Sequence, residues 1–167
     1  PWDGIVRVDS ADPRFLSADG KLVWPVGPNL RSVWDLRSQE RLGTALTVDR
    51  GTLSYDAYLL RAAAGGADAC EIWLSSWNLA LEWLDRWDGF HGTGRWNLGN
   101  AWKLDHILDR AEVLGVRVNL VINNHGQASD KTDKEWDNSP WNHVNGGPLH
   151  GAAELFTDPR AIASQGA

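Results

Sequence analysis

The sequence predicts an α/β fold in which an N-terminal β-hairpin precedes three βα units on parallel strands. Two observations predict it. Short apolar segments typical of strands alternate with segments that have the apolar periodicity of helices. Each long polar loop follows a strand, whereas the turns after the helices are tight. We interpret the 167 residues as a single domain, with the hairpin over 1–25 and the βα units over 26–167.

The N-terminal hairpin is predicted from its turn. Two apolar runs flank Asp19-Gly20, a dipeptide that favours a tight turn between antiparallel strands. Pro25 lacks a backbone N–H and limits the pairing of the second run. Residues 26–30 are predicted to form a short, largely apolar strand, with the polar Asn29 near its end.

The remaining elements alternate along the chain. Gly65-Gly66 and Gly115 are predicted to end two helices, because glycine adopts the left-handed conformation that terminates a helix. The predicted helices cover 52–64 and 98–114, a third begins at 157–159, and the predicted strands cover 69–74 and 116–122. Long loops over 75–97 and 123–156 follow these strands, at the edge where α/β folds place their binding sites.

Composition excludes several classes of function. A net charge of −6 with a pI near 5.3 and no basic run argues against a nucleic-acid surface. No apolar stretch reaches the roughly 20 residues that a membrane span needs. The histidine spacing fits no zinc pattern, and no glycine-rich phosphate loop follows a strand, so we expect neither metal nor cofactor. Cys70, in an apolar run, is predicted to be a core residue.

The unusual feature of the composition is 11 Trp against 3 Phe and 2 Tyr. The flat apolar face of an indole matches the C–H face of a pyranose ring, so tryptophan in loops after strands indicates sugar binding. The alternative is that these rings pack the loops against one another. The loop tryptophans are Trp77, Trp83, Trp87, Trp96, Trp136 and Trp141. Trp77 and Trp141 are the two predicted to stack on sugar, whereas Trp73 is predicted to support the core.

Several segments resemble glycoside hydrolase family 5 and its relatives of the cellulase and mannanase clan, over roughly residues 15–160. Gly20-Lys21-Leu22-Val23-Trp24-Pro25-Val26-Gly27-Pro28-Asn29-Leu30 resembles the hairpin and first barrel strand, which ends Gly-x-Asn. Residues 65–74 resemble the second strand, and 104–118 resemble the helix and strand that follow. Asn123-Asn124-His125-Gly126 lies where these enzymes carry a polar cluster after the third strand.

This resemblance implies a partial (β/α)8 TIM barrel, comprising the first three βα units after the N-terminal β-hairpin. It implies the substrate-binding part of a retaining hydrolase that acts on a β-linked polysaccharide and is secreted or extracytoplasmic. The catalytic glutamates of such enzymes follow the fourth and seventh strands, so we expect them beyond Ala167 and none in this chain. The expected partners are a polysaccharide or oligosaccharide and the missing remainder of the barrel. The predicted substrate-binding residues are Asn29, Trp77, Asn124, His125 and Trp141.

Alternatives stand beside these assignments. Asn29 and Asn124 suit sugar hydroxyls but equally form turns, and His125 suits a subsite or a local backbone contact. Glu71 stands where the family has arginine, which favours a non-catalytic carbohydrate-binding protein on a degenerate barrel. A third possibility is an interaction module whose tryptophan-rich loops contact protein. Four carboxylates near the second loop are interpreted as solvated charge rather than as a catalytic pair: Glu71, Glu82, Asp85 and Asp88.

Overall fold

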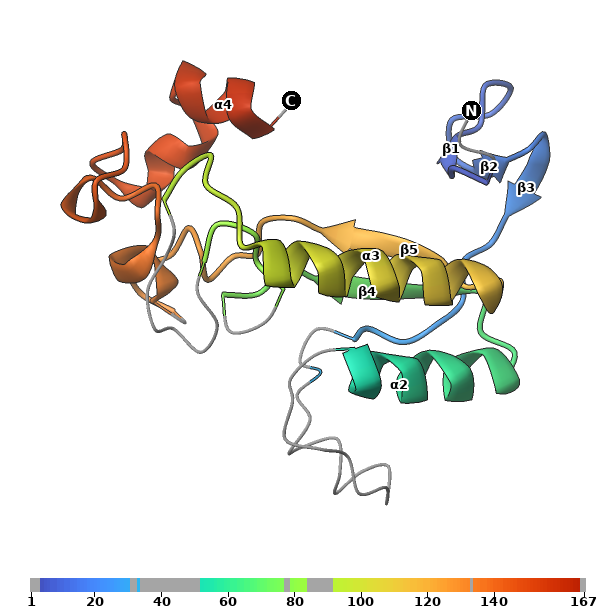
Figure 1. The fold of residues 1–167 in the computed structure, drawn as a ribbon. Helices are drawn as coiled ribbons and strands as arrows, with labels where there is room; N and C mark the ends of the chain where they lie inside the picture. Colours follow the sequence, from blue (N-terminus) through green and yellow to red (C-terminus); the bar gives the residue numbers. More distant parts are fainter. Residues whose placement is uncertain are drawn as a thin grey trace.

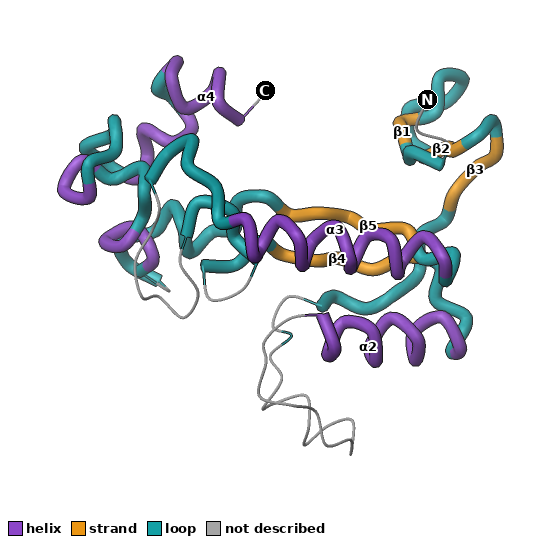
Figure 2. The backbone as a smooth tube through the Cα atoms, viewed as in Figure 1, coloured by secondary structure: helices purple, strands orange, loops and turns teal. Residues whose placement is uncertain are grey.

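The computed structural model describes residues 4–30, 33, 52–76, 79–83, 92–132 and 134–165. Within these residues, three strands form an antiparallel sheet and two strands form a parallel sheet. In chain order the elements are β1 (Arg7–Val8), β2 (Leu16–Ala18), β3 (Lys21–Val23), α2 (Thr52–Ala64), β4 (Ala69–Trp73), α3 (Leu98–Val113), β5 (Arg117–Val121), three short 3₁₀ helices η2 (Glu135–Asn138), η3 (His143–Asn145) and η4 (Ala152–Phe156), and α4 (Pro159–Gln165). The antiparallel sheet lies at one end of the parallel sheet and α4 at the other (Figures 1 and 2).

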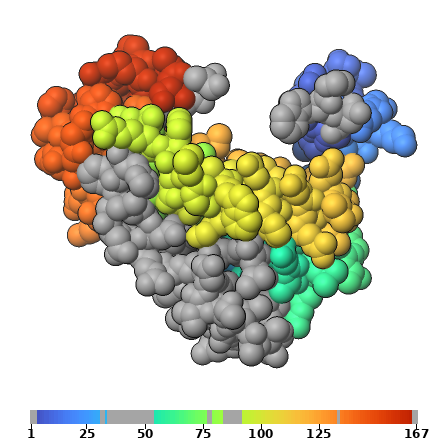
Figure 3. All heavy atoms as spheres, viewed as in Figure 1, coloured from blue at the N-terminus to red at the C-terminus, as the bar shows by residue number. Residues whose placement is uncertain are grey.

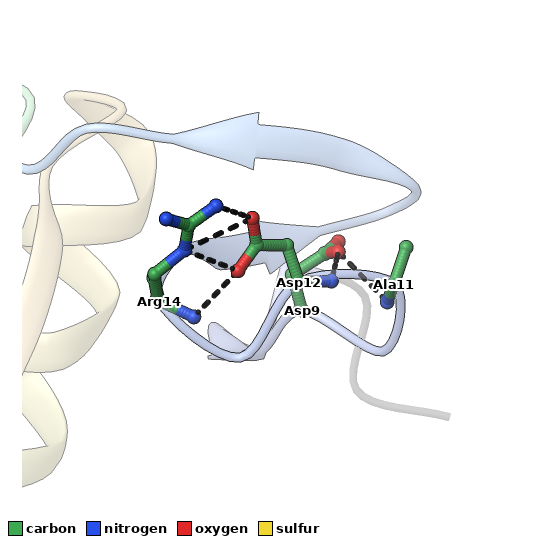
Figure 4. A network of polar contacts seen from close by, with 4 residues as sticks. All are labelled: Asp9, Ala11, Asp12 and Arg14. Atoms are coloured by element: carbon green, nitrogen blue, oxygen red, sulfur yellow. Dashed lines mark hydrogen bonds and ion pairs between the residues drawn. The ribbon is translucent and has the colours of Figure 1, made fainter.

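The predicted hairpin is present. β2 and β3 pair antiparallel, and the turn between them is Asp19-Gly20, with φ of 51° and 72°. The connection from β1 to β2 is held by local polar contacts (Figure 4). The Asp9 carboxylate accepts the backbone N–H groups of Ala11 and Asp12 at 2.9 and 3.0 Å, and the Arg14 guanidinium donates to Asp12 at 2.6 Å. Contacts between near neighbours in the sequence therefore hold the connection between β1 and β2.

The core lies between β4 and the two long helices. β4 and β5 pair in parallel, with Cys70 opposite Val118 and Ile72 opposite Leu120. One face of this sheet is covered by α2 and α3, whose Leu59 and Ile107 are fully buried against it. Cys70 belongs to this core as expected, and its burial raises the pKa of the thiol to about 11. The helix-facing side chains thus explain the apolar periodicity of both helices.

The prediction of the first three βα units of a (β/α)8 barrel is wrong. In the described residues the parallel sheet has two strands, β4 and β5, and residues 26–30 form no strand. That segment runs beside β4 with one isolated bridge, Asn29 to Glu71. The physical reason is proline: Pro25 and Pro28 have no N–H to donate, so a regular ladder cannot extend along the segment. The predicted helices over 52–64 and 98–114 are present, the second ending at Val113.

Residues 26–30 still approach β4 closely. The backbone N–H of Leu30 donates to the carbonyl of Glu71 at 2.7 Å, and that of Glu71 donates to Pro28 at 3.1 Å. A Cβ atom at Gly27 would overlap the carbonyl oxygen of Ala69, so only glycine fits there. The close approach links the antiparallel sheet to the parallel one. No helix among the described residues is long and apolar enough to cross a membrane.

Candidate functional site

A pocket lies at the carboxyl ends of β4 and β5. Leu74, directly after β4, and Asn123, two residues after β5, both line it. Its volume is about 360 Å³, within the ~300–1,000 Å³ that is common for ligand sites. Three indole rings contribute to its walls, those of Trp83, Trp96 and Trp141. We call it the tryptophan pocket. It occupies the edge of the sheet at which α/β folds bind their ligands.

The three tryptophans of this pocket differ in exposure. Trp83 is 4% exposed and serves mainly as packing, whereas Trp96 is 56% exposed. Trp141 is half-buried and packs against the small apolar cluster formed around Trp136 and Leu155. Trp96 and Trp141 therefore both line the pocket and keep accessible ring surface, which a ligand with an apolar face can cover.

Two asparagines hold the first wall of the pocket at the start of α3. Asn97 caps the helix by accepting the backbone N–H of Asn100 at 3.1 Å, and its own amide donates to the carbonyl of Trp83 at 3.1 Å. The buried Asn100 amide donates to the carbonyl of Ala80 at 2.9 Å. Since the capping residue follows Trp96 directly, these bonds fix Trp83 and Trp96 relative to the helix.

The second wall comes from the segment after β5. The buried Gln127 side chain donates to the carbonyl of Leu74 at 2.9 Å, so the two segments that follow the parallel strands are tied together. The carbonyl of Trp141 accepts the backbone N–H of Leu149 at 2.9 Å, and Asn142 donates from its amide to the carbonyl of Trp136 at 3.1 Å. These bonds set the backbone position from which the Trp141 ring reaches the pocket.

Glu82 is the ionisable side chain among the described residues that line the pocket. Its carboxylate accepts the backbone N–H of Gly94 at 2.6 Å, and Trp141 lines the same pocket. Burial raises the pKa of the Glu82 carboxyl above its usual value, and the hydrogen bond from Gly94 offsets the rise only in part. A half-desolvated carboxyl among aromatic rings is typical of functional sites.

The two predicted asparagines make contacts within the protein. Asn29 donates from its amide to Glu71 at 2.6 Å. Asn124 is 4% exposed, and its side-chain oxygen accepts the backbone N–H groups of Gly126 and Gln127 at 2.8 and 3.3 Å. The Asn124 contacts are those of a turn-forming asparagine. Neither residue lines the tryptophan pocket.

The other three predicted residues are placed differently. Trp141 lines the pocket. His125 is exposed and meets the ring of Trp73 edge-on, with 6.1 Å between ring centroids. Trp77 lies outside the residues that the structure describes, as does Trp87. A ligand contact by any of the five predicted residues stays a prediction.

Glu71 lies at the centre of a second polar cluster, on the sheet face opposite the helices. Its carboxylate accepts three side-chain donors: Asn29 at 2.6 Å, the Trp73 indole at 2.6 Å and the Asn119 amide at 3.1 Å. The strand register brings Glu71 opposite Asn119. The resemblance implies an arginine at position 71, and three neutral donors surround the carboxylate that replaces it.

Sequence reasoning missed Glu82, Asn123 and Gln127 as pocket residues. The signal for Glu82 was its place between Leu81 and Trp83, two apolar neighbours that are half-buried and buried in the structure. Asn123 was part of the polar run after β5, but the prediction chose the two residues that follow it. Nothing local marks Gln127, whose position depends on the carbonyl of Leu74, 53 residues away.

No cluster of three or more metal-binding side chains occurs within the described ranges. No protein-family model and no curated protein matches the sequence. The resemblance to glycoside hydrolases therefore remains a hypothesis drawn from the motifs, and the function is inferred from the geometry of the tryptophan pocket.

Proposed function

We propose that this chain binds a β-linked oligosaccharide or polysaccharide in the tryptophan pocket, as the substrate-binding part of a β-glycoside hydrolase. The observation that carries the proposal is the gathering of Trp83, Trp96 and Trp141 around one pocket at the carboxyl ends of β4 and β5. A hydrolase of polysaccharides would act outside the cytoplasm, so a secreted or extracytoplasmic location belongs to the same proposal.

The chemistry of the pocket suits a sugar. The accessible rings of Trp96 and Trp141 offer apolar faces for the C–H surface of a pyranose. Around them, Asn123 and Gln127 present amides and Glu82 a carboxyl, groups that can donate to or accept from sugar hydroxyls. An apolar platform with a few polar groups beside it is the general pattern of a small-molecule site.

Hydrolysis needs more than this pocket supplies. Retaining glycosidases use two carboxyl groups about 5–5.5 Å apart, one as acid and base and one as nucleophile. Among the described residues that line the pocket, Glu82 is the one carboxyl group. The proposal therefore gives this chain the binding of the glycan and leaves the catalytic pair to residues elsewhere in the enzyme.

One observation favours a second candidate, a carbohydrate-binding protein without hydrolytic activity. The carboxylate of Glu71 stands where the resemblance implies an arginine, and Asn29, Trp73 and Asn119 satisfy it with three hydrogen bonds. Because a carboxylate stands at position 71 and three neutral donors satisfy it, position 71 offers no cation that could support a nucleophile. The hydrolase and the non-catalytic binding protein would both bind glycan in the tryptophan pocket, and only the hydrolase would cleave it.

Isothermal titration calorimetry with cellohexaose and mannohexaose tests the shared proposal. We expect binding by the unaltered chain and a loss of about tenfold or more in affinity for Trp141→Ala, because the stacking surface is removed. Trp102→Ala is the matched control: Trp102 is 63% exposed on α3, does not line the pocket and should leave affinity unchanged. Absence of binding to either sugar, or equal losses in both variants, would contradict the proposal.

A further inference from the structure

The charge in the tryptophan pocket is of one sign. Among the described residues that line it, Glu82 is acidic and none is Lys, Arg or His. Arg95 and His143, close in sequence to the two accessible rings, are exposed, and neither lines the pocket. The pocket therefore combines aromatic rings and amides with a single carboxyl group, on a chain whose net charge is −6.

The carboxylate of Glu82 is held in place by one backbone contact. It accepts the N–H of Gly94 at 2.6 Å, from a segment 12 residues further along the chain. The side chain is partly buried, so solvent and salt screen its charge less than they screen an exposed carboxylate. A carboxylate has about four acceptor positions on its two oxygens, and one backbone N–H leaves positions that a ligand can use.

We propose that Glu82 is a specificity-determining residue, which makes the tryptophan pocket prefer β-linked amino sugars to neutral sugars and disfavour uronic acids. An ammonium group is attracted by a carboxylate and also by the face of an indole, and Trp96 and Trp141 line the same pocket. A uronate would bring a second negative charge beside Glu82, and no cation among the described lining residues would pair with it. This inference rests on the proposed function and narrows its substrate class.

The burial of Glu82 supports the same order of preference. Burial raises the pKa of its carboxyl, which means that the ionised form is held at a cost in this pocket. A neighbouring ammonium lowers that cost, because an opposite charge favours the ionised form. A sugar hydroxyl lowers it less, since a hydrogen bond between two charged groups is stronger than one with a neutral donor. A uronate raises it, because like charges disfavour ionisation.

Isothermal titration calorimetry at pH 6, where an amino sugar is largely protonated, tests the inference with β-1,4-linked hexamers of glucosamine, glucose and mannuronate. We expect the unaltered chain to bind the glucosamine hexamer about fivefold or more tightly than cellohexaose, and the mannuronate hexamer about fivefold or more weakly. Glu82→Gln removes the charge and keeps an acceptor oxygen for Gly94. It should bind the glucosamine hexamer and cellohexaose within about twofold of each other.

Glu112→Gln is the matched control, because it changes the net charge equally at an exposed position of α3 outside the pocket. It should keep the order of affinities of the unaltered chain. Absence of binding to all three hexamers would contradict the proposed function itself. Cellohexaose bound by the unaltered chain at least as tightly as the glucosamine hexamer would overturn the specificity role alone. An equal loss of preference in Glu82→Gln and Glu112→Gln would also overturn it, since overall charge would then be the cause.

Discussion

The two ends of the parallel sheet are built in different ways. At the amino end, the connection from β1 to β2 is held by contacts within a few residues, and large apolar side chains such as Leu22 and Trp24 are 66% and 75% exposed. At the carboxyl end, side chains reach across 12 to 53 residues to close the tryptophan pocket. Figure 3 shows a gap between the antiparallel sheet and the C-terminal segment. The carboxyl end holds the tryptophan pocket, and it is the end at which we propose that a ligand binds.

The largest expected effect concerns the joint between these two ends. Gly27→Ala should destabilise the fold by about 3 kcal/mol or more, because the new Cβ overlaps the backbone of Ala69 and the segment must move away from β4. Gly151→Ala is the matched control, since nothing lies within 4 Å of the added atom and its φ of −142° is ordinary. Urea unfolding measures both, and a similar stability of the two variants would show that 26–30 does not join the sheets closely.

A middle-sized effect separates long-range from local polar contacts. Asn97→Ala removes a helix cap and the bond to Trp83, and should cost about 1–2 kcal/mol in urea unfolding. Asp9→Ala removes two turn contacts of a half-buried side chain in the connection between β1 and β2, and should cost clearly less. Equal costs, or a larger cost for Asp9→Ala, would remove the distinction between the two ends.

The smallest effect is a difference in acid response. Hydrogen bonds from Asp12 and Ala11 lower the pKa of Asp9 below 3.8, so its contribution to stability is present above that value and is lost as pH falls through the lowered pKa. Burial raises the pKa of Glu82, so its contribution is present below the ordinary 4.5 and is lost as pH rises through the raised pKa.

Carboxyl titrations followed by NMR should therefore give a midpoint below 3.8 for Asp9 and a midpoint above 4.5 for Glu82. Glu82→Gln should also raise the melting temperature slightly at pH 7, by less than about 2 °C, because a neutral amide is buried at lower cost than a carboxylate. A midpoint for Glu82 below 4.5, or a lower melting temperature for Glu82→Gln, would show that the hydrogen bonds outweigh the burial.

Local signals in the sequence explain which elements were predictable. The turn at Asp19-Gly20 is predictable because an Asp-Gly pair favours a tight turn through its own backbone conformation. The helix over 52–64 ends before Gly65-Gly66 because glycine can terminate a helix without contacts to distant residues. The barrel prediction failed at 26–30, where the apolar pattern suggested a strand but two prolines removed the donors of its ladder. A pattern of apolar residues reports burial more reliably than it reports strand pairing.

The candidate site was predictable only in outline. Tryptophan in the loops after strands drew attention to the carboxyl end of the sheet, where Trp141 lines the pocket, and its contact with sugar stays a prediction. Glu82 was interpreted as solvated loop charge because its hydrogen-bond partner, Gly94, lies 12 residues further along the chain. The sequence left open whether Asn124 binds sugar or forms a turn, and the structure shows the contacts of a turn-forming asparagine.

We propose that a glycan covers Trp96 and Trp141 at the carboxyl end of the parallel sheet and does not contact the tryptophans away from the pocket. Titrating cellohexaose into the ¹⁵N-labelled chain and following the indole N–H signals tests it most directly. We expect the signals of Trp96 and Trp141 to move as the protein is saturated, while those of Trp24 and Trp102 stay fixed. Signals of Trp96 and Trp141 that stay fixed while another indole moves would contradict it.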